Sequence, residues 1–300
     1  MFSQTKTKES MNHYWDSIRQ ATNLIQNANH ILVGVGSGAT AAGGLCYTDP
    51  ALAEKWYPEY FGMGKKSIID IMSDFWPTTL NDKNATAFWG FWAKHIYHIR
   101  YEAEALQPYI DLFQILKDKQ HFICSTNVDG QLEKTGFSKE IIFAPQGEYA
   151  LFQCSKPCTQ EVYQNKPMID TMLANMVSPF EIHTTDIPRC PNCGGYLIPN
   201  LRCDYAFVEK PHMQNANKYK VFLSEVSENN LVLLELGVGI NTPGIIRYPF
   251  ERIAAQYPKA SLVRINISST ALPKEIEEKS VGIENDVGKI LRDIVCFDKR

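Results

Sequence analysis

The sequence has little of what marks a membrane or nucleic-acid-binding protein. No apolar run approaches the roughly 20 residues that a helix needs to span a bilayer. The first ten residues, MFSQTKTKES, contain no apolar stretch of the kind found in secretory signals. Lysine and arginine (30) do not outnumber aspartate and glutamate (33), and the net charge is −3. We therefore expect a soluble, cytoplasmic protein with no nucleic-acid or membrane partner.

Internal repeats and low-complexity linkers are also absent. A chain of 300 residues with 44% hydrophobic content is long enough for one large or two modest domains around a substantial core. The eight cysteines occur in a chain without an export signal. This context favours reduced thiols or metal ligands over disulfides.

Short apolar runs separated by helical patterns dominate the rest of the sequence. Buried strands are expected at residues 31–35, 121–125, 231–236 and 262–265. Helical spacing occurs at residues 11–29, 83–106 and 109–118. Strands that alternate with helices predict an α/β fold with a doubly wound, Rossmann-like parallel sheet.

Two insertions interrupt this predicted sheet domain. Residues 51–108 are expected to form a helical insertion, and residues 150–204 a small four-cysteine module with little strand pattern. The Rossmann-like domain then comprises residues 1–50, 109–149 and 205–300.

A glycine-rich turn follows the first predicted strand. Gly36, Ser37, Gly38 and Thr40 stand between that strand and a helical pattern. Such a turn brings backbone N–H groups against a phosphate. Taken alone, it is equally explained by tight packing of a strand against a helix.

A second polar segment, STNVDG at residues 125–130, follows the strand at 121–125. Asn, Asp and Gly favour plain turns. However, ligands bind outside the carboxyl edge of a doubly wound sheet, and Asn127 and Asp129 are expected there. Gln146 follows nineteen residues after Asn127. We favour a functional role for this group.

Four cysteines occur as two pairs, Cys154-x3-Cys158 and Cys190-x2-Cys193. Tetrahedral zinc binds four thiolates, and four protein ligands leave no open position for chemistry. A structural zinc site is therefore expected. The first pair is one residue wider than usual, so a metal-free vestige is the alternative, with Cys203 as a spare ligand.

In this order the motifs resemble those of the sirtuins nearly end to end. The turn at residues 36–44 resembles the sirtuin GAGxSxxxG pattern, and residues 125–130 resemble its TQNIDG segment. The run that ends at Pro199 matches the PxCxGxLxP half of the sirtuin zinc module. Two departures stand out: Tyr47-Thr48-Asp49 follows the glycine turn, and Gln146 replaces the catalytic histidine. With Gly-Val-Gly-x-Asn-Thr-Pro at residues 237–243, they resemble the macrodomain-linked sirtuin class of microbial operons.

This resemblance implies NAD as co-substrate and zinc as a structural ion. The implied catalytic residues are Asn127, Asp129 and Gln146. The implied NAD-binding residues are Gly36, Ser37, Gly38, Thr40, Tyr47, Asn127, Asp129, Gln146, Gly237, Val238, Asn241, Asn266, Asp286 and Val287. The implied zinc ligands are Cys154, Cys158, Cys190 and Cys193.

The same resemblance implies transfer of ADP-ribose from NAD to a protein. The implied acceptor is a lipoyl-carrier protein similar to the glycine-cleavage H protein, with a macrodomain hydrolase and a lipoate-protein ligase as functional partners. Independently, the amide of Gln146 cannot take up a proton at pH 7. An acidic acceptor side chain is already ionised at that pH and needs no base. NAD hydrolysis and non-catalytic NAD sensing are the alternatives, and lysine deacylation is disfavoured.

Overall fold

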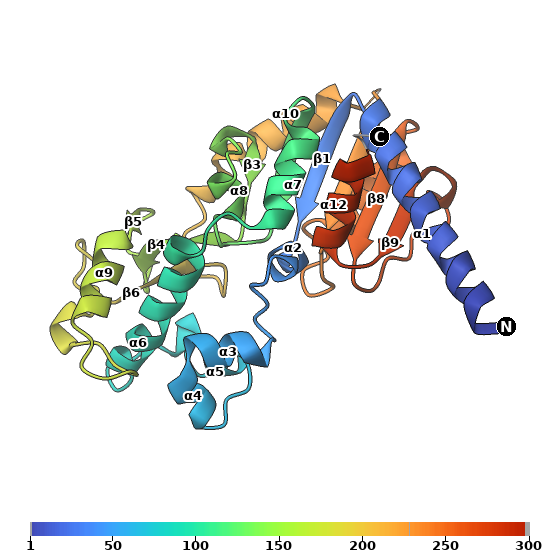
Figure 1. The fold of residues 1–300 in the computed structure, drawn as a ribbon. Helices are drawn as coiled ribbons and strands as arrows, with labels where there is room; N and C mark the ends of the chain where they lie inside the picture. The colour runs from blue at the N-terminus through green and yellow to red at the C-terminus, as the bar shows by residue number, and fades with distance from the viewer. Residues whose placement is uncertain (1, 228, 298–300) are drawn as a thin grey trace.

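The computed structural model describes residues 2–227 and 229–297, and its larger lobe is built on a six-stranded parallel sheet (Figure 1). The strand order is β3-β2-β1-β7-β8-β9. The strands are β1 (His30–Val35), β2 (Gln120–Ser125), β3 (Ile142–Phe143), β7 (Leu231–Leu236), β8 (Ala260–Asn266) and β9 (Val281–Glu284). Because β1 pairs in parallel with both β2 and β7, the chain winds outward from the centre in two directions. The predicted doubly wound fold is confirmed.

Strand composition explains this placement. In β7, LVLLEL, all six residues are buried, and β1 is buried from Ile31 to Val35. Continuous apolar runs of this kind suit strands covered on both faces. One face is covered by α1 (Phe2–Asn27), α7 (Gln107–Leu116) and α12 (Val287–Phe297), the other by α10 (Ala216–Glu225) and α11 (Arg247–Gln256).

The smaller lobe combines the two predicted insertions around one hydrophobic core. Its helices are α3 (Pro50–Trp56), α4 (Pro58–Gly62), α5 (Ile68–Asp74), α6 (Ala85–Ile96), the π-helix Tyr97–Glu102 and α9 (Lys166–Ala174). Phe88, Trp89 and Trp92 of α6 share this core with Phe152 and Cys190 from the cysteine-containing segment. Residues 51–108 and 150–204 therefore pack as one body.

The sequence analysis was wrong to expect little strand structure in residues 150–204. A three-stranded antiparallel sheet, in order β5-β4-β6, consists of β4 (Gly147–Cys154), β5 (Val162–Gln164) and β6 (Leu197–Leu201). Nearly all of β4 is buried, so its sequence lacks the alternation that marks a half-exposed strand. With only three residues, β5 is too short to give a pattern.

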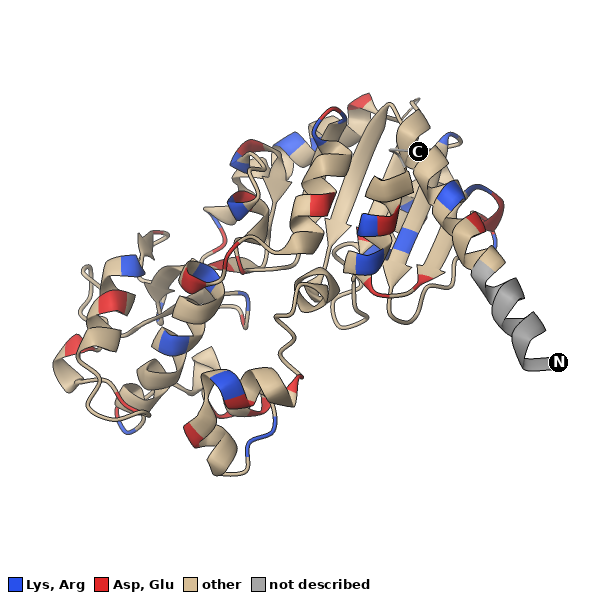
Figure 2. Ribbon diagram, in the orientation of Figure 1, with Lys and Arg blue, Asp and Glu red and all other residues tan. Residues whose placement is uncertain are grey.

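Short elements complete the chain. They are α2 (Ser37–Ala42), α8 (Gln131–Lys134) and the 3-10 turns Pro77–Thr79, Lys139–Ile141, Thr184–Asp186, His212–Asn215 and Glu277–Lys279. Basic and acidic residues are scattered over both lobes without a large region of one sign (Figure 2). Among the described helices, none is both long and apolar enough to cross a membrane.

The turns after β1 and β7 touch backbone to backbone. A Cβ added at Gly36 would lie 2.5 Å from the carbonyl oxygen of Gly237. Gly237 itself has a φ of 59°, and its own added Cβ would lie 2.5 Å from the nitrogen of Ala39. These glycines therefore have a packing role in addition to any role at a ligand.

A buried ion pair joins the neighbouring strands β7 and β8. Arg264 of β8 and Glu235 of β7 are both fully buried, and the guanidinium Nε lies 2.7 Å from Glu235 Oε1. Arg264 also contacts Glu251 of α11 at 2.7 Å and donates to the carbonyl of Ala271 at 2.7 Å. Every charge is thus paired and hydrogen-bonded, as burial requires.

We expect Arg264→Met to lower the free energy of unfolding by about 3–5 kcal/mol, because it leaves the Glu235 carboxylate buried and unpaired. Urea unfolding followed by circular dichroism measures this. The control is Arg19→Met, which breaks an exposed pair with Asp16 (3.1 Å apart) and should cost less than about 1 kcal/mol. Equal losses in both variants would contradict the assigned role of the buried pair.

Candidate functional site

A cavity of about 730 Å³ lies at the carboxyl edge of the parallel sheet. Its walls come from the β1–α2 turn, the segment after β2, and the loops after β7, β8 and β9. The predicted residues that line it are Ser37, Gly38, Thr40, Tyr47, Asn127, Asp129, Gly237, Asn241, Asn266, Asp286 and Val287. Residues from five separate segments therefore meet at one site of the size that binds small molecules.

Three predicted residues do not line this cavity. Gly36 contacts Gly237 behind the turn, and Val238 is only 3% exposed. Gln146 lies just before β4, and its side-chain Oε1 is buried without a hydrogen-bond partner. A buried acceptor without a donor is costly. A ligand that offers a hydroxyl hydrogen would relieve that cost.

The polar floor of the cavity is a directional hydrogen-bond chain. Asn127 Nδ2 donates to the Tyr109 hydroxyl at 2.9 Å and to the carbonyl of Gly36 at 3.0 Å. The Tyr109 and Thr40 hydroxyls are 2.7 Å apart, and Thr40 donates to Asp129 Oδ2 at 2.6 Å. Because the amide N–H groups of Asn127 point into the fold, its Oδ1 is left without a partner among the described residues.

Asp129 ends this chain as a buried carboxyl group. Burial raises its pKa, while hydrogen bonds from Thr40 and from the backbone N–H of Gln131 act in the opposite direction. The carboxyl is therefore fixed in direction by two donors and shielded from water. Asp129 was predicted from the sequence, but Tyr109, which joins this chain through Thr40 and Asn127, was not, because its only signal was a helical pattern.

At the other end of the cavity the side chains hold the loops. Asn266 Nδ2 donates to the carbonyl of Val238 at 3.0 Å, and its Oδ1 accepts from the N–H of Ile267 at 2.9 Å. Asp286 Oδ1 accepts from the N–H of Lys289 at 2.9 Å and so caps α12. Both residues line the cavity, but these side-chain atoms also fix its backbone.

Two aromatic residues form part of the wall beside Asp129. Tyr47 follows α2, and Tyr149 lies on β4, where its N–H donates to the carbonyl of Val128 at 2.9 Å. Behind them lies His95 of α6, which is fully buried and 3.2 Å from the Tyr149 hydroxyl. The sequence analysis missed Tyr149 and left His95 as a packing or surface residue, since aromatic content alone does not separate a core from a cavity wall.

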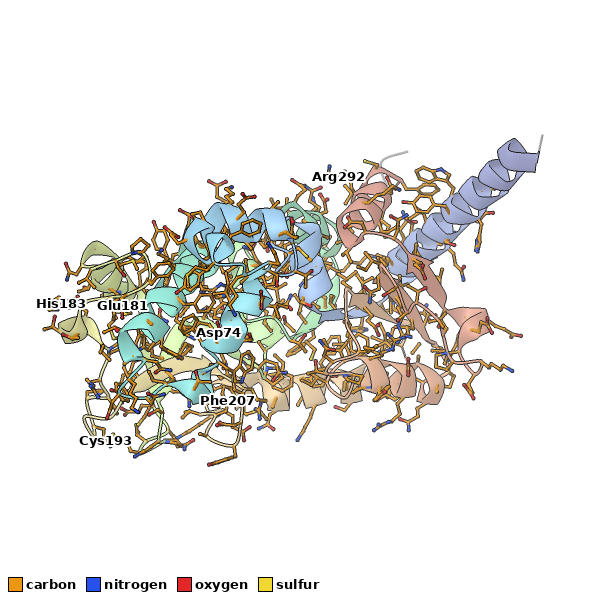
Figure 3. All side chains as sticks on the ribbon, turned by 90° about the horizontal axis from the view of Figure 1, so that it is seen from below. Asp74, Glu181, His183, Cys193, Phe207 and Arg292 are labelled. Carbon is orange, nitrogen blue, oxygen red and sulfur yellow. The ribbon has the colours of Figure 1, made fainter. Side chains whose placement is uncertain are left out.

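The four predicted metal ligands meet at the outer end of the smaller lobe, where Figure 3 labels Cys193 far from Arg292 of α12. The four Sγ atoms of Cys154, Cys158, Cys190 and Cys193 all lie within 4.8 Å of one another. Two of the pairs are 3.6 Å apart, too far for disulfides. Thiolates around tetrahedral zinc, at about 2.3 Å from the ion, stand about 3.8 Å apart. The cluster therefore fits zinc, despite the widened first pair.

Hydrogen bonds favour the thiolate at one of the four cysteines. Burial raises the pKa of Cys190, but hydrogen bonds from the backbone N–H groups of Cys193 and Asn192 and from neighbouring thiols lower that pKa to about 6, whereas burial raises the pKa of Cys154 to about 12. The thiolate is the form that binds a metal.

We expect about one zinc ion per chain in protein purified without chelators. Cys190→Ser should abolish zinc retention and lower the melting temperature, because it removes a ligand of a structural site. Cys203→Ser is the matched control, since Cys203 lies outside the cluster, and it should keep both properties. Elemental analysis and thermal denaturation test this; zinc retained by Cys190→Ser would contradict it.

A second expectation concerns acid stability. Burial, with a smaller effect of His98, lowers the pKa of His95 to about 3, while an unfolded histidine titrates near 6.5. Below pH 6.5 His95 binds a proton in the unfolded chain but not in the folded one. The free energy of unfolding therefore falls as the pH decreases toward 3. The contribution is at most about 1.4 kcal/mol per pH unit. His95→Gln should lose stability less steeply than the parent between pH 6 and 4; equal slopes in urea titrations would refute this.

In sequence this chain is similar to ADP-ribosyltransferases, and in fold it is similar to sirtuins. No protein-family model matches the chain. It is 26% identical over 273 residues to a protein ADP-ribosyltransferase of Staphylococcus aureus (strain Mu50 / ATCC 700699), covering 89% of this chain and 83% of that protein. It is also 26% identical over 295 residues to a probable bifunctional ADP-ribose hydrolase/ADP-ribosyltransferase of Fusarium oxysporum f. sp. cubense. That match covers 92% of this chain, which spans 47% of the fungal protein.

The fold agrees with these relatives. The structure of Sir2Tm bound to a propionylated peptide matches with a TM-score of 0.59 and 12% identity, covering 94% of this chain and 98% of that one. In sequence this chain is similar to proteins named as ADP-ribosyltransferases, and its fold is that of the Sir2 sirtuin structures.

Proposed function

We propose that this protein transfers ADP-ribose from NAD to an acidic side chain of a lipoyl-carrier protein similar to the glycine-cleavage H protein. The observation that carries the choice of acceptor is the lack of the histidine that sirtuin deacylases use as their base. Of the described residues that line the cavity, none is histidine. Its ionisable side chains are Asp129, Asp286, Tyr47, Tyr149 and Cys46.

Two amide oxygens, one in the cavity lining and one buried just before β4 outside that lining, are available to accept hydrogen bonds from the sugar of NAD. Asn127 Oδ1 and Gln146 Oε1 both lack a donor among the described residues. Ribose hydroxyls are donors, so these two amides are suited to orient them. When bound, NAD supplies a glycosidic bond to nicotinamide whose cleavage makes the ribose carbon electrophilic. The protein's task is then to fix the sugar and place the acceptor.

Chemistry at Gln146 favours an acceptor that is already a nucleophile. An amide oxygen of acyl-lysine is a poor nucleophile, and its reaction needs a base to deprotonate a ribose hydroxyl. Gln146 cannot supply that base. A glutamate or aspartate carboxylate is ionised at pH 7 and can attack directly.

The segment after α2 adds a second reason. Asp49 accepts a hydrogen bond from the N–H of Ala51 at 2.9 Å and caps α3. Tyr47 is packed edge-on against the ring of His95, with centroids 5.1 Å apart. Both side chains are thus committed to the local fold at the positions where deacylases carry aspartate and arginine. This arrangement disfavours deacylation.

The functional partners are proposed on similar grounds. The Fusarium relative is named for both an ADP-ribose hydrolase and an ADP-ribosyltransferase activity. A chain that combines the two supports a working link between this transferase and a macrodomain hydrolase that reverses the modification. A lipoate-protein ligase would then supply the lipoyl-carrying acceptor.

The test is release of nicotinamide and transfer of labelled ADP-ribose to a lipoyl-carrier protein. Asn127→Ala should reduce both by about a hundredfold, because it removes an acceptor that positions the sugar. Gln146→Ala should impair transfer for the same reason. Gln146→His should gain little deacylase activity on acyl-lysine peptides, since Tyr47 and Asp49 remain.

Two outcomes would decide against the proposal. Equal rates of free ADP-ribose formation with and without any acceptor would indicate an NAD hydrolase. Tight NAD binding by the parent without nicotinamide release, in purified form and in lysate, would indicate a sensor. Lys220→Ala, far from the cavity on α10, is a control that should behave as the parent.

A further inference from the structure

A histidine stands between two tyrosines in the core of the smaller lobe. His95 Nδ1 lies 3.1 Å from the hydroxyl of Tyr57, and His95 Nε2 lies 3.2 Å from the hydroxyl of Tyr149. His95 and Tyr57 are fully buried, and Tyr149 is 4% exposed. Only Tyr149 of the three lines the NAD cavity, where its hydroxyl interacts with that of Tyr47.

The imidazole in this position is neutral. It is enclosed by the ring of Phe91, stacked at 5.4 Å, and by the edges of Trp92 and Tyr149. The titratable groups that face it are the hydroxyls of Tyr47, Tyr57 and Tyr149, whose pKa values burial raises, and the nearby ring of His98. No carboxylate pairs with it among the described residues, so a proton on both nitrogens would be a buried, uncompensated charge.

Counting hydrogens then fixes the direction of the chain. A neutral imidazole has one N–H donor and one acceptor nitrogen. Among the described residues, His95 is the one hydrogen-bond partner of the Tyr57 hydroxyl. If His95 carried its hydrogen on Nδ1, the buried Tyr57 hydrogen would have no acceptor, at a cost of about 1–3 kcal/mol. The Tyr57 hydroxyl therefore donates to Nδ1, and the imidazole hydrogen is on Nε2.

This tautomer determines whether Tyr149 presents a hydrogen-bond donor to the cavity. His95 Nε2–H donates to the oxygen of Tyr149, so the Tyr149 hydroxyl hydrogen must point away from His95. The Tyr149 oxygen also accepts from the Tyr47 hydroxyl, so the direction left for its own hydrogen is toward the cavity beside Asp129. An anionic ligand group is disfavoured next to the Asp129 carboxyl. The donor therefore suits a neutral oxygen, and the neutral carbonyl of NAD is that of its nicotinamide carboxamide.

We propose that His95 is a positioning residue which, as the Nε2–H tautomer held by Tyr57, turns the Tyr149 hydroxyl toward the cavity to bind the nicotinamide carboxamide oxygen. This inference rests on the proposed use of NAD at this site. It assigns Tyr149 a contact with the ligand, and His95 and Tyr57 a role exerted through Tyr149.

The first test does not depend on turnover. Long-range ¹H–¹⁵N spectra of protein labelled at histidine distinguish the two neutral tautomers, and His95→Gln identifies the His95 signals. We expect an Nε2–H pattern that does not titrate between pH 5 and 8. An Nδ1–H pattern, or titration in that range, would overturn the proposal even if the enzyme transfers ADP-ribose.

The second test measures NAD affinity and nicotinamide release in variants of the chain. Tyr149→Phe and His95→Leu should each lower the product of NAD affinity and nicotinamide-release rate by about tenfold. This is the effect of losing one hydrogen bond of about 1.4 kcal/mol. His95→Gln should stay within about threefold of the parent, because an amide also offers one donor and one acceptor. Phe91→Leu is the matched control, since Phe91 stacks on His95 without a hydrogen bond.

The variants separate positioning from simple destabilisation. If His95→Leu and Phe91→Leu lose activity equally, or if His95→Gln fails to rescue while folded, His95 acts only in packing and the proposal fails. If the parent neither binds nor consumes NAD, the proposed function fails instead. The tautomer spectra then still test the direction of the hydrogen bonds around His95.

Discussion

Contact between the turns that follow β1 and β7 determines where every other part of the site can lie. Gly36 and Gly38 approach Gly237 so closely that a single Cβ on any of them would collide with backbone. This approach places the start of α2 and the loop after β7 side by side in the wall of one cavity. Asn127 is then fastened to the same turn through the carbonyl of Gly36. The positions of the cavity floor and walls therefore depend on one backbone contact. The residues that follow β1, β2 and β7 are held in place through it.

Much of the larger lobe was predictable because parallel strands leave a simple signal. Runs such as LVLLEL are buried on both faces, and the polar segments after them fall at the carboxyl edge. The cysteine pairs were equally readable, since the short spacing within each pair is typical of metal ligands, and the fold brings the two pairs together. What the sequence did not reveal lies in the smaller lobe, with the exception of Tyr109 on α7. Tyr149, Tyr109 and His95 have no spacing that separates a hydrogen-bonded side chain from a core side chain, and β4 is buried too evenly to show a strand period. The prediction that Gln146 contacts the ribose also stays open, because its Oε1 is buried but outside the cavity lining.

Two hydrogen-bond chains reach the cavity from opposite lobes, and they have different chemistry. The chain Asn127–Tyr109–Thr40 ends on the Asp129 carboxyl, so it collects hydrogens onto an acceptor. The chain Tyr57–His95–Tyr149 begins at a hydroxyl with one acceptor and runs outward, so it delivers a hydrogen to the cavity. Neither chain presents a histidine to the described lining of the cavity. A transferase whose acceptor arrives already ionised has no need for one, whereas a deacylase does.

Strand β4 carries both Tyr149 and Cys154, five residues apart, with Phe152 between them packed on Trp89 at 4.7 Å. At about 3.3 Å per residue, the cavity wall and the first cysteine of the cluster are at most about 17 Å apart along one strand, which carries an irregularity between Glu148 and Phe152. The thiol cluster and the tyrosine are thus mechanically linked through one buried strand and one shared core. Removing the metal or oxidising the cysteines would free the Cys154 end of β4. The position of Tyr149 in the cavity wall would then change, although no residue at the cavity had reacted.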